Sequence, residues 1–160
     1  MILAAMKFRF YLLLYVAAVV LLVVALFQNV ACLIEHNGAE AWIDNFKYVA
    51  VDGAVSYSVL PMAVVLIVAV AVNLFASFVS LFSNFVLQKR SSVLSVLLLS
   101  GYYILLLVYS LILTGDAAVE MHPAFFMPLI ALVMNVAAFM LARREEARII
   151  SRSLGFRLRD

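Results

Sequence analysis

Four polar side chains recur at helical spacing inside a long apolar stretch of this sequence. Asn73, Ser77, Ser80 and Asn84 are separated by four, three and four residues, a spacing that places them along one face of an α-helix. In hydrocarbon, such amide and hydroxyl groups form hydrogen bonds between helices, or they line a polar path. The stripe therefore has two interpretations, a contact between helices and the lining of a pathway. Similar polar groups occur in two further apolar stretches, at Tyr102, Tyr103, Tyr109 and Asn135.

Side chains that commonly catalyse reactions or bind metals are few, and they lie between the apolar stretches. His36 and His122 stand in polar segments, where they meet carboxylates only if those segments come together. Cys32 is the single cysteine, which excludes an intramolecular disulfide and a cysteine-based metal site. No serine with a neighbouring histidine and acid, and no phosphate-binding glycine loop, is present. We therefore expect no catalytic residue, no metal site and no cofactor.

The polar groups belong to four charge-free apolar spans, at residues 10–34, 53–88, 91–115 and 121–142. Each span exceeds the roughly 20 residues that a helix needs to cross a hydrocarbon core about 30 Å thick. With 68% hydrophobic and 12% charged residues, a soluble domain of this size would lack polar side chains to cover its surface. The sequence predicts an all-α integral membrane protein, a bundle of four transmembrane helices at about residues 8–30, 59–87, 92–113 and 123–144.

The charges between the spans are sorted by sign. Lys47 is the only one of eleven bases that falls in the segments at 31–58 and 116–120. Six of the nine acids fall there: Glu35, Glu40, Asp44, Asp52, Asp116 and Glu120. Because positively charged loops are retained in the cytoplasm during insertion, both termini are predicted to be cytoplasmic. The first span is longer than the core of a signal peptide, so we expect it to be retained as a helix.

The outer loop at residues 31–58 is the only long segment predicted outside the membrane. Two short apolar runs flank Asp52-Gly53, a dipeptide typical of a two-residue hairpin turn. We therefore predict a small β-hairpin that leans on the bundle, because a lone hairpin is marginally stable in water. Four aromatic residues in this loop are candidates for contacts with the headgroup region or with a partner: Trp42, Phe46, Tyr48 and Tyr57.

Two features are predicted on the cytoplasmic side. The turn at residues 88–91 is short, so the second and third helices must form an antiparallel hairpin. After the membrane domain at 1–144, residues 145–160 form a basic amphipathic cytoplasmic tail, whose bases attract anionic lipids. The bases predicted to contact lipid or a partner here are Arg143, Arg144, Arg148, Arg152, Arg157 and Arg159. No motif points to nucleic-acid binding.

Two short motifs resemble an uncharacterised bacterial family of four-helix membrane proteins, domain-of-unknown-function family 4293. The first is Ser83-Asn84-Phe85-Val86-Leu87-Gln88-Lys89-Arg90, followed by Ser95-Val96-Leu97-Leu98-Leu99. The second runs from Pro128-Leu129-Ile130-Ala131 through Asn135 and Ala142-Arg143-Arg144-Glu145-Glu146 to Arg152-Ser153-Leu154-Gly155-Phe156-Arg157-Leu158-Arg159. Here Gly155 stands where the family usually has a charge. The resemblance implies a multi-pass protein of the bacterial inner membrane, without a known activity.

Three functions are compatible with these patterns. The first is a non-catalytic accessory or scaffold subunit of a membrane complex, bound to other membrane subunits and to lipid. The second is a small homo-oligomeric transporter or channel lined by the polar stripe, although the centres of the spans lack the ionisable residues of a proton-coupled carrier. The third, which has the least support, is a lipid-modifying enzyme that uses His36 and His122.

Overall fold

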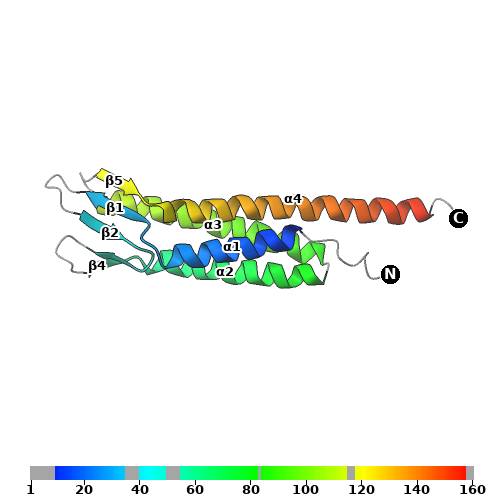
Figure 1. Ribbon diagram of the computed structural model, residues 1–160, viewed down its shortest axis with the longest axis horizontal. Helices are drawn as coiled ribbons and strands as arrows, with labels where there is room; N and C mark the ends of the chain where they lie inside the picture. The colour runs from blue at the N-terminus through cyan, green and yellow to red at the C-terminus, as the bar shows by residue number, and fades with distance from the viewer. Residues whose placement is uncertain (1–9, 35–39, 50–54, 83, 115–117, 158–160) are drawn as a thin grey trace.

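The computed structural model describes residues 10–34, 40–49, 55–82, 84–114 and 118–157, and these residues form four helices and five short strands. The helices run side by side, and the strands form a sheet at one end of the bundle (Figure 1). The bounds of the helices are α1 Phe10–Leu26, α2 Leu60–Leu81, α3 Phe85–Thr114 and α4 Pro123–Arg157. The prediction of a mainly helical membrane-type fold is therefore confirmed, with a sheet that is larger than predicted.

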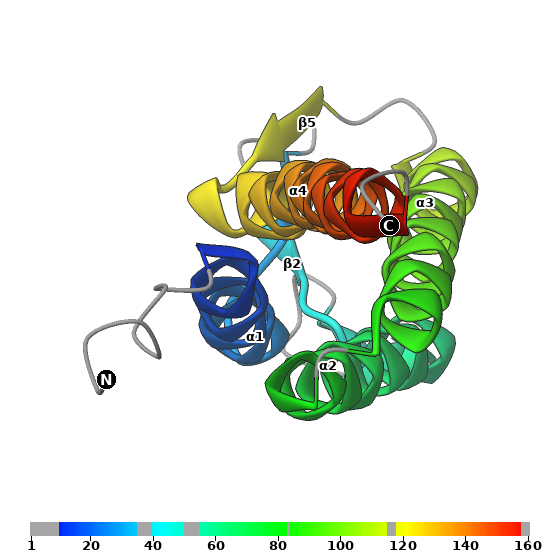
Figure 2. The same ribbon diagram turned by 90° about the vertical axis from the view of Figure 1, so that its right-hand side faces the viewer.

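Each helix packs against two neighbours. Helix α1 contacts α2 and α4, and α3 contacts the same two helices from the other side, so α1 and α3 lie on a diagonal (Figure 2). Helices α2, α3 and α4 are long and apolar enough to cross a membrane. The described part of α1 is apolar but has 17 residues, which is shorter than the usual span.

Most buried positions of each helix alternate in steps of four and three residues. Because a helix turns once in 3.6 residues, such steps keep one narrow seam facing the bundle axis, as in coiled coils. Many seam residues are small or polar, which lets helices approach closely in a membrane. The seams are Tyr11, Tyr15, Ala18, Leu22 and Ala25 on α1; Met62, Leu66, Ala69, Asn73, Ala76 and Ser80 on α2; Gln88, Ser92, Ser95, Leu99, Tyr102 and Leu106 on α3; and Ala124, Pro128, Ala131, Asn135, Ala138 and Ala142 on α4.

The sheet is antiparallel, with strand order β4-β3-β2-β1-β5. The strands are β1 Ala31–Ile34, β2 Glu40–Ile43, β3 Lys47–Val49, β4 Val55–Ser58 and β5 Ala118–Met121. Strand β5 comes from the connection between α3 and α4, so the sheet joins the two connections at this end of the bundle. One face of the sheet packs on the end of α3, through a cluster that includes Leu33, Ile43 and Leu113.

The predicted hairpin corresponds to β3 and β4. Lys47 pairs with Ser58 and Tyr48 with Tyr57, whereas Val49, nearer the turn, pairs with Val55 and departs by one residue from the register of a two-residue turn at positions 52 and 53. The register then shifts between Tyr48 and Val49. The Asp52-Gly53 turn itself lies outside the described residues.

The connection between α2 and α3 differs from the sequence prediction. Helix α2 ends at Leu81 instead of residue 87, and α3 begins at Phe85 instead of residue 92. The Asn84 side chain explains the earlier start of α3, because its Oδ1 accepts a hydrogen bond from the Leu87 N–H at 3.2 Å, as an N-cap does. The segment predicted as the turn, residues 88–91, is therefore helical, while the predicted antiparallel arrangement of the two helices is observed.

The ends of α1 and α4 also differ from the predicted bounds. Helix α1 ends at Leu26, because Val30 already pairs with the sheet through its N–H to the Ile43 carbonyl at 2.8 Å. Helix α4 begins at Pro123 as predicted, but it continues through the basic segment to Arg157. No proline or glycine interrupts the segment between residues 144 and 154, which accounts for this continuation.

Candidate functional site

A buried polar layer crosses the interior of the bundle at Asn73 and Asn135. The Asn73 Nδ2 donates to the Ala69 carbonyl at 2.8 Å and to the Ser95 Oγ at 2.7 Å, so this side chain joins α2 to α3. The Asn135 Nδ2 donates to the Ala131 carbonyl of its own helix at 2.9 Å. Each asparagine comes four residues after an alanine of one apolar cluster, Ala69 or Ala131, and three residues before an alanine of a second cluster, Ala76 or Ala138. Both asparagines therefore lie between the two clusters, in the same layer of the bundle.

A second group of buried polar side chains lies closer to the α2–α3 connection. The Tyr15 hydroxyl and the Ser92 Oγ share a hydrogen bond that joins α1 to α3 across the diagonal of the bundle. The Ser92 Oγ also donates to the Gln88 carbonyl at 3.1 Å. The Gln88 side chain is fully buried. The half of the bundle nearer the α2–α3 connection therefore has a polar interior.

Some atoms of these two groups lack a hydrogen-bond partner within the described residues. They are the Oδ1 of Asn73 and the Oδ1 of Asn135. The Gln88 side chain interacts with the Tyr15 hydroxyl. An unpaired amide in a bundle interior has a high desolvation cost, and it is free to accept or donate to a small polar molecule. These atoms are the strongest structural support for a pathway or a hydrated interior.

The predicted polar stripe is divided between two elements. Ser77 donates to the Asn73 carbonyl at 2.9 Å and Ser80 donates to the Ser77 carbonyl at 2.7 Å, so both hydroxyls bond to the backbone of α2. Asn84 does not belong to α2; it is exposed and caps α3. The structure thus brings Asn73 and Ser80 into the bundle interior and leaves Asn84 at its end.

A junction that the sequence did not predict is centred on Asn45, in the turn between β2 and β3. Its Nδ2 donates to the Ala25 carbonyl at 2.7 Å and to the Leu26 carbonyl at 3.4 Å, and its Oδ1 accepts from the Tyr102 hydroxyl at 2.8 Å. Its own carbonyl accepts the Ala63 N–H at 3.1 Å. Asn45 therefore bonds to α1, α2 and α3 at once, and it is fully buried.

The sequence feature that indicates the turn at this junction is the Asp44-Asn45 pair. The Asp44 Oδ1 accepts hydrogen bonds from the N–H groups of Phe46 and Lys47, both at 2.7 Å. This is the side-chain turn that aspartate and asparagine commonly form. The turn was recognisable in the sequence, but its insertion between the helices was not.

The outer aromatic residues have separate surroundings. Trp42 lies against His122 with ring centroids 5.2 Å apart, Phe46 is exposed, and Tyr48 packs beside the apolar face of the sheet. Tyr57 pairs with Tyr48 in the sheet register, but its side chain is not among the described ones. Among the described side chains, those of Trp42, Phe46 and Tyr48 do not converge on one site.

Cys32 lies on β1 between Trp42 of β2 and Glu120 of β5. Burial raises the pKa of its thiol, and the carboxylates of Glu40 and Glu120 raise it further. Among the described residues, no three His, Cys, Asp or Glu side chains form a group suited to a metal ion. His36 lies outside the described residues.

The bases at the opposite end are distributed along α3 and α4. Lys89 forms an ion pair with Glu146, with 2.6 Å between Nζ and Oε2. This pair connects the start of α3 to the part of α4 at residues 145–157, which is the α4 extension beyond the predicted end of the helix. Arg143, Arg144 and Arg148 are exposed on α4. Two further predicted contact residues, Arg152 and Arg157, belong to α4 without described side chains, and Arg159 lies outside the described residues.

The fold and its polar interior define a class of protein: a four-helix bundle of membrane-spanning type with a small antiparallel sheet over one end. The chain belongs to the DUF4293 family, a domain of unknown function, whose model matches residues 10–151. The family resemblance seen in the sequence is thereby confirmed. No curated protein matches the chain.

Proposed function

We propose that this protein is a non-catalytic accessory or scaffold subunit of a larger membrane complex. The observation that supports this role is the use of its interior polar groups as links between helices: Asn73 bonds to Ser95, and Tyr15 bonds to Ser92. Groups that already hold helices together are poorly suited to bind a changing substrate. The surfaces left for interaction are the two ends and the apolar outer faces of the helices.

We further propose that all four helices span the membrane. Helix α1 packs along both α2 and α4, so a bilayer that contains these two longer helices also surrounds α1. Large apolar side chains are exposed on the outer surface of every helix, which suits contact with lipid. Examples are Val20 on α1, Phe78 on α2, Ile104 on α3 and Val133 on α4.

The proposed orientation places both termini in the cytoplasm of a bacterium, with the protein in the inner membrane. The start of α1, the α2–α3 connection and the α4 extension share one end of the bundle, opposite the sheet (Figure 1). Lys89, Arg90 and the arginines of α4 lie at that end, whereas Glu40, Asp44 and Glu120 lie at the sheet end. The positive-inside rule supports this orientation.

The α4 extension is the proposed contact surface for a partner or for anionic lipid. It carries exposed Arg148 beside Ile149 and Ile150, which are 51% and 52% exposed. Replacing Arg148, Arg152, Arg157 and Arg159 by glutamine is expected to leave the protein inserted while weakening this contact, because Arg143 and Arg144 still hold the orientation. Unchanged recovery of lipid and partner would limit the extension to a role in topology.

The decisive experiment for the accessory role is the native mass of the protein, extracted from its own membrane in mild detergent. A fixed ratio of this chain to foreign subunits is expected. A ring of identical chains would instead support a homo-oligomeric transporter or channel, the function favoured by the unpaired Oδ1 atoms of Asn73 and Asn135.

A further inference from the structure

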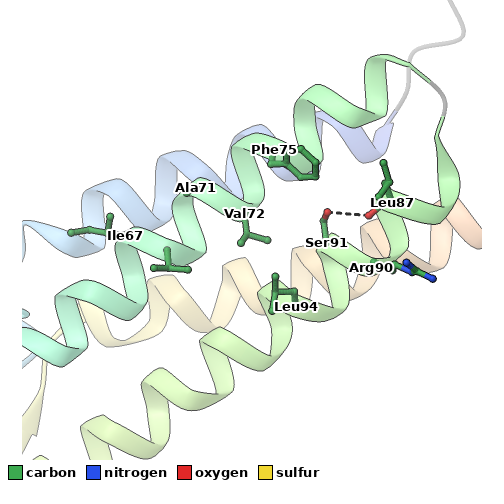
Figure 3. A pocket seen from close by; sticks show the side chains of 9 residues that line it. Ile67, Ala71, Val72, Phe75, Leu87, Arg90, Ser91 and Leu94 are labelled. Carbon is green, nitrogen blue, oxygen red and sulfur yellow. Dashed lines mark hydrogen bonds between the residues drawn. The ribbon is translucent and has the colours of Figure 1, made fainter.

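An apolar groove runs between α2 and α3 on the outer surface of the bundle. It has a volume of about 440 Å³, within the range of about 300–1,000 Å³ that is common for small-molecule sites. Ile67, Ala71 and Phe75 line it from α2, and Leu87 and Leu94 line it from α3 (Figure 3). The Ser91 hydroxyl is also at the groove, but it donates to the Leu87 carbonyl at 3.0 Å and so adds no unpaired donor.

The length of the groove along α2 is comparable to the thickness of one leaflet of a bilayer. From Ile67 to Phe75 the helix rises about 12 Å, and half of a hydrocarbon core is about 15 Å thick. The α3 side of the groove starts at Leu87, close to the cap at Asn84. The groove therefore begins near the end of the bundle that carries the α2–α3 connection and extends past the middle of α2, as far as Ile67.

Arg90 is the charged residue of this groove. Its guanidinium points away from the apolar lining and from α2 (Figure 3). It is exposed, and within the described part of the chain no carboxylate pairs with it. The adjacent Lys89 differs, because its charge is matched by Glu146. The mouth of the groove thus carries one uncompensated positive charge of the kind that binds phosphate through two parallel hydrogen bonds.

We propose that this groove binds an anionic phospholipid of the cytoplasmic leaflet, with an acyl chain along α2 and α3 and the phosphate on Arg90. The charge at one end and the apolar walls along the rest match the two parts of such a lipid. The assignment to the cytoplasmic leaflet rests on the orientation in the proposed function. Binding itself does not, since the groove and Arg90 are the same in either orientation.

The test measures lipid retention by the purified full chain in mild detergent, by native mass spectrometry. The protein is mixed with equal amounts of phosphatidylglycerol and phosphatidylcholine with identical acyl chains. We expect preferential retention of phosphatidylglycerol. Arg90→Gln is expected to reduce that preference about fivefold, the effect of one base near a membrane surface. Ala71→Phe, which fills the groove from an exposed position, is expected to lower retention of both lipids.

Two control variants separate this site from general effects. Lys47→Gln removes an equal charge from an exposed position at the sheet end, and Val136→Phe fills the smaller groove of about 190 Å³ between α3 and α4. Both are expected to keep the preference for phosphatidylglycerol. Equal losses in Arg90→Gln and Lys47→Gln would overturn the proposal, because net charge alone would explain them.

A protein occupant of the groove would also overturn the proposal. If Ala71→Phe dissociates a dimer of this chain, or releases a foreign subunit, while lipid retention is unchanged, the groove is a protein interface. These results are distinct from a failure of the accessory role, which is judged by the subunit composition of the extracted complex and needs no lipid measurement.

Discussion

Asn45 connects three helices through its side-chain amide and its backbone carbonyl. The Nδ2 binds carbonyls in the last turn of α1, the Oδ1 accepts from Tyr102 of α3, and the backbone oxygen accepts from the first turn of α2. Asn45→Ala is expected to lower the free energy of unfolding by about 2–3 kcal/mol, because it leaves buried donors and acceptors without partners. Unfolding in mild detergent, followed by circular dichroism during addition of a denaturing detergent, measures this loss.

Tyr102→Phe is the matched control for this junction. It removes a single hydrogen bond and leaves the Nδ2 contact with Ala25 intact, so the expected loss is about 1 kcal/mol. The two losses should not add in the double variant, since both remove the bond between Asn45 and Tyr102. An Asn45→Ala variant as stable as the native protein would show that the junction does not hold the helices.

The second prediction compares two asparagines in different positions: Asn73 is buried between helices, and Asn84 is exposed and caps α3. Asn73→Leu removes a buried link between α2 and α3, and hydrogen bonds of this kind in membranes are worth on average about 0.6 kcal/mol. Asn84→Leu removes the cap of α3, with an expected cost of about 1 kcal/mol. If Asn73 lines a pathway, its variant should abolish flux in reconstituted vesicles while the fold survives; unchanged flux would contradict the channel function.

At the scale of the helices, the buried seams explain which contacts could be predicted from the sequence. Hydrophobic periodicity identifies a buried face only when the other faces are polar, whereas here the outer faces of the helices are equally apolar. The usable signal is the recurrence of small and polar residues, as in Ala69, Asn73 and Ala76 of α2. Asn73 and Asn135 were recognisable because they are polar, and the alanines beside them were not.

The sheet shows the limit of local sequence signals. The hairpin of β3 and β4 was predicted from Asp52-Gly53, because a two-residue turn gives a strong local pattern. Strands β1, β2 and β5 have four residues each, and β1 pairs with β5 across more than 80 positions of sequence. A pairing between Leu33 and Val119 depends on how α2 and α3 return the chain to the same end, and this is a property of the whole fold.

The ion pair between Lys89 and Glu146 is the contact that ties the α4 extension to α3, and both side chains are about a quarter exposed. Lys89→Glu is expected to cost about 0.5–1 kcal/mol and to loosen the extension, because it places two carboxylates together. The double variant Lys89→Glu, Glu146→Lys should restore most of this loss. Hydrogen exchange along residues 143–151 measures the loosening; equal protection in the single variant and the native protein would contradict it.

For the whole molecule, the two ends of the bundle are built differently. The sheet end is closed by β-strand pairing and by Asn45, and the larger apolar cluster lies nearby, around Leu66 and Leu99. The opposite end has a polar interior at Gln88 and Ser92 and a helix that extends past its neighbours. This asymmetry was visible in the sequence only as the sorting of charges by sign.

The last prediction concerns orientation, and Cys32 makes it easy to test. Its thiol is 2% exposed and its pKa is raised by burial, so it should contribute little background to labelling by a thiol reagent near neutral pH. A single cysteine is then introduced either at exposed Phe46, beside Asp44, or at exposed Arg148. The two variants should differ in whether the thiol reagent labels them in intact cells. Phe46→Cys is expected to react in intact cells, and Arg148→Cys only after permeabilisation, because the bases gather at the α4 end. Labelling of Arg148→Cys in intact cells would show that the bundle is inserted the other way round.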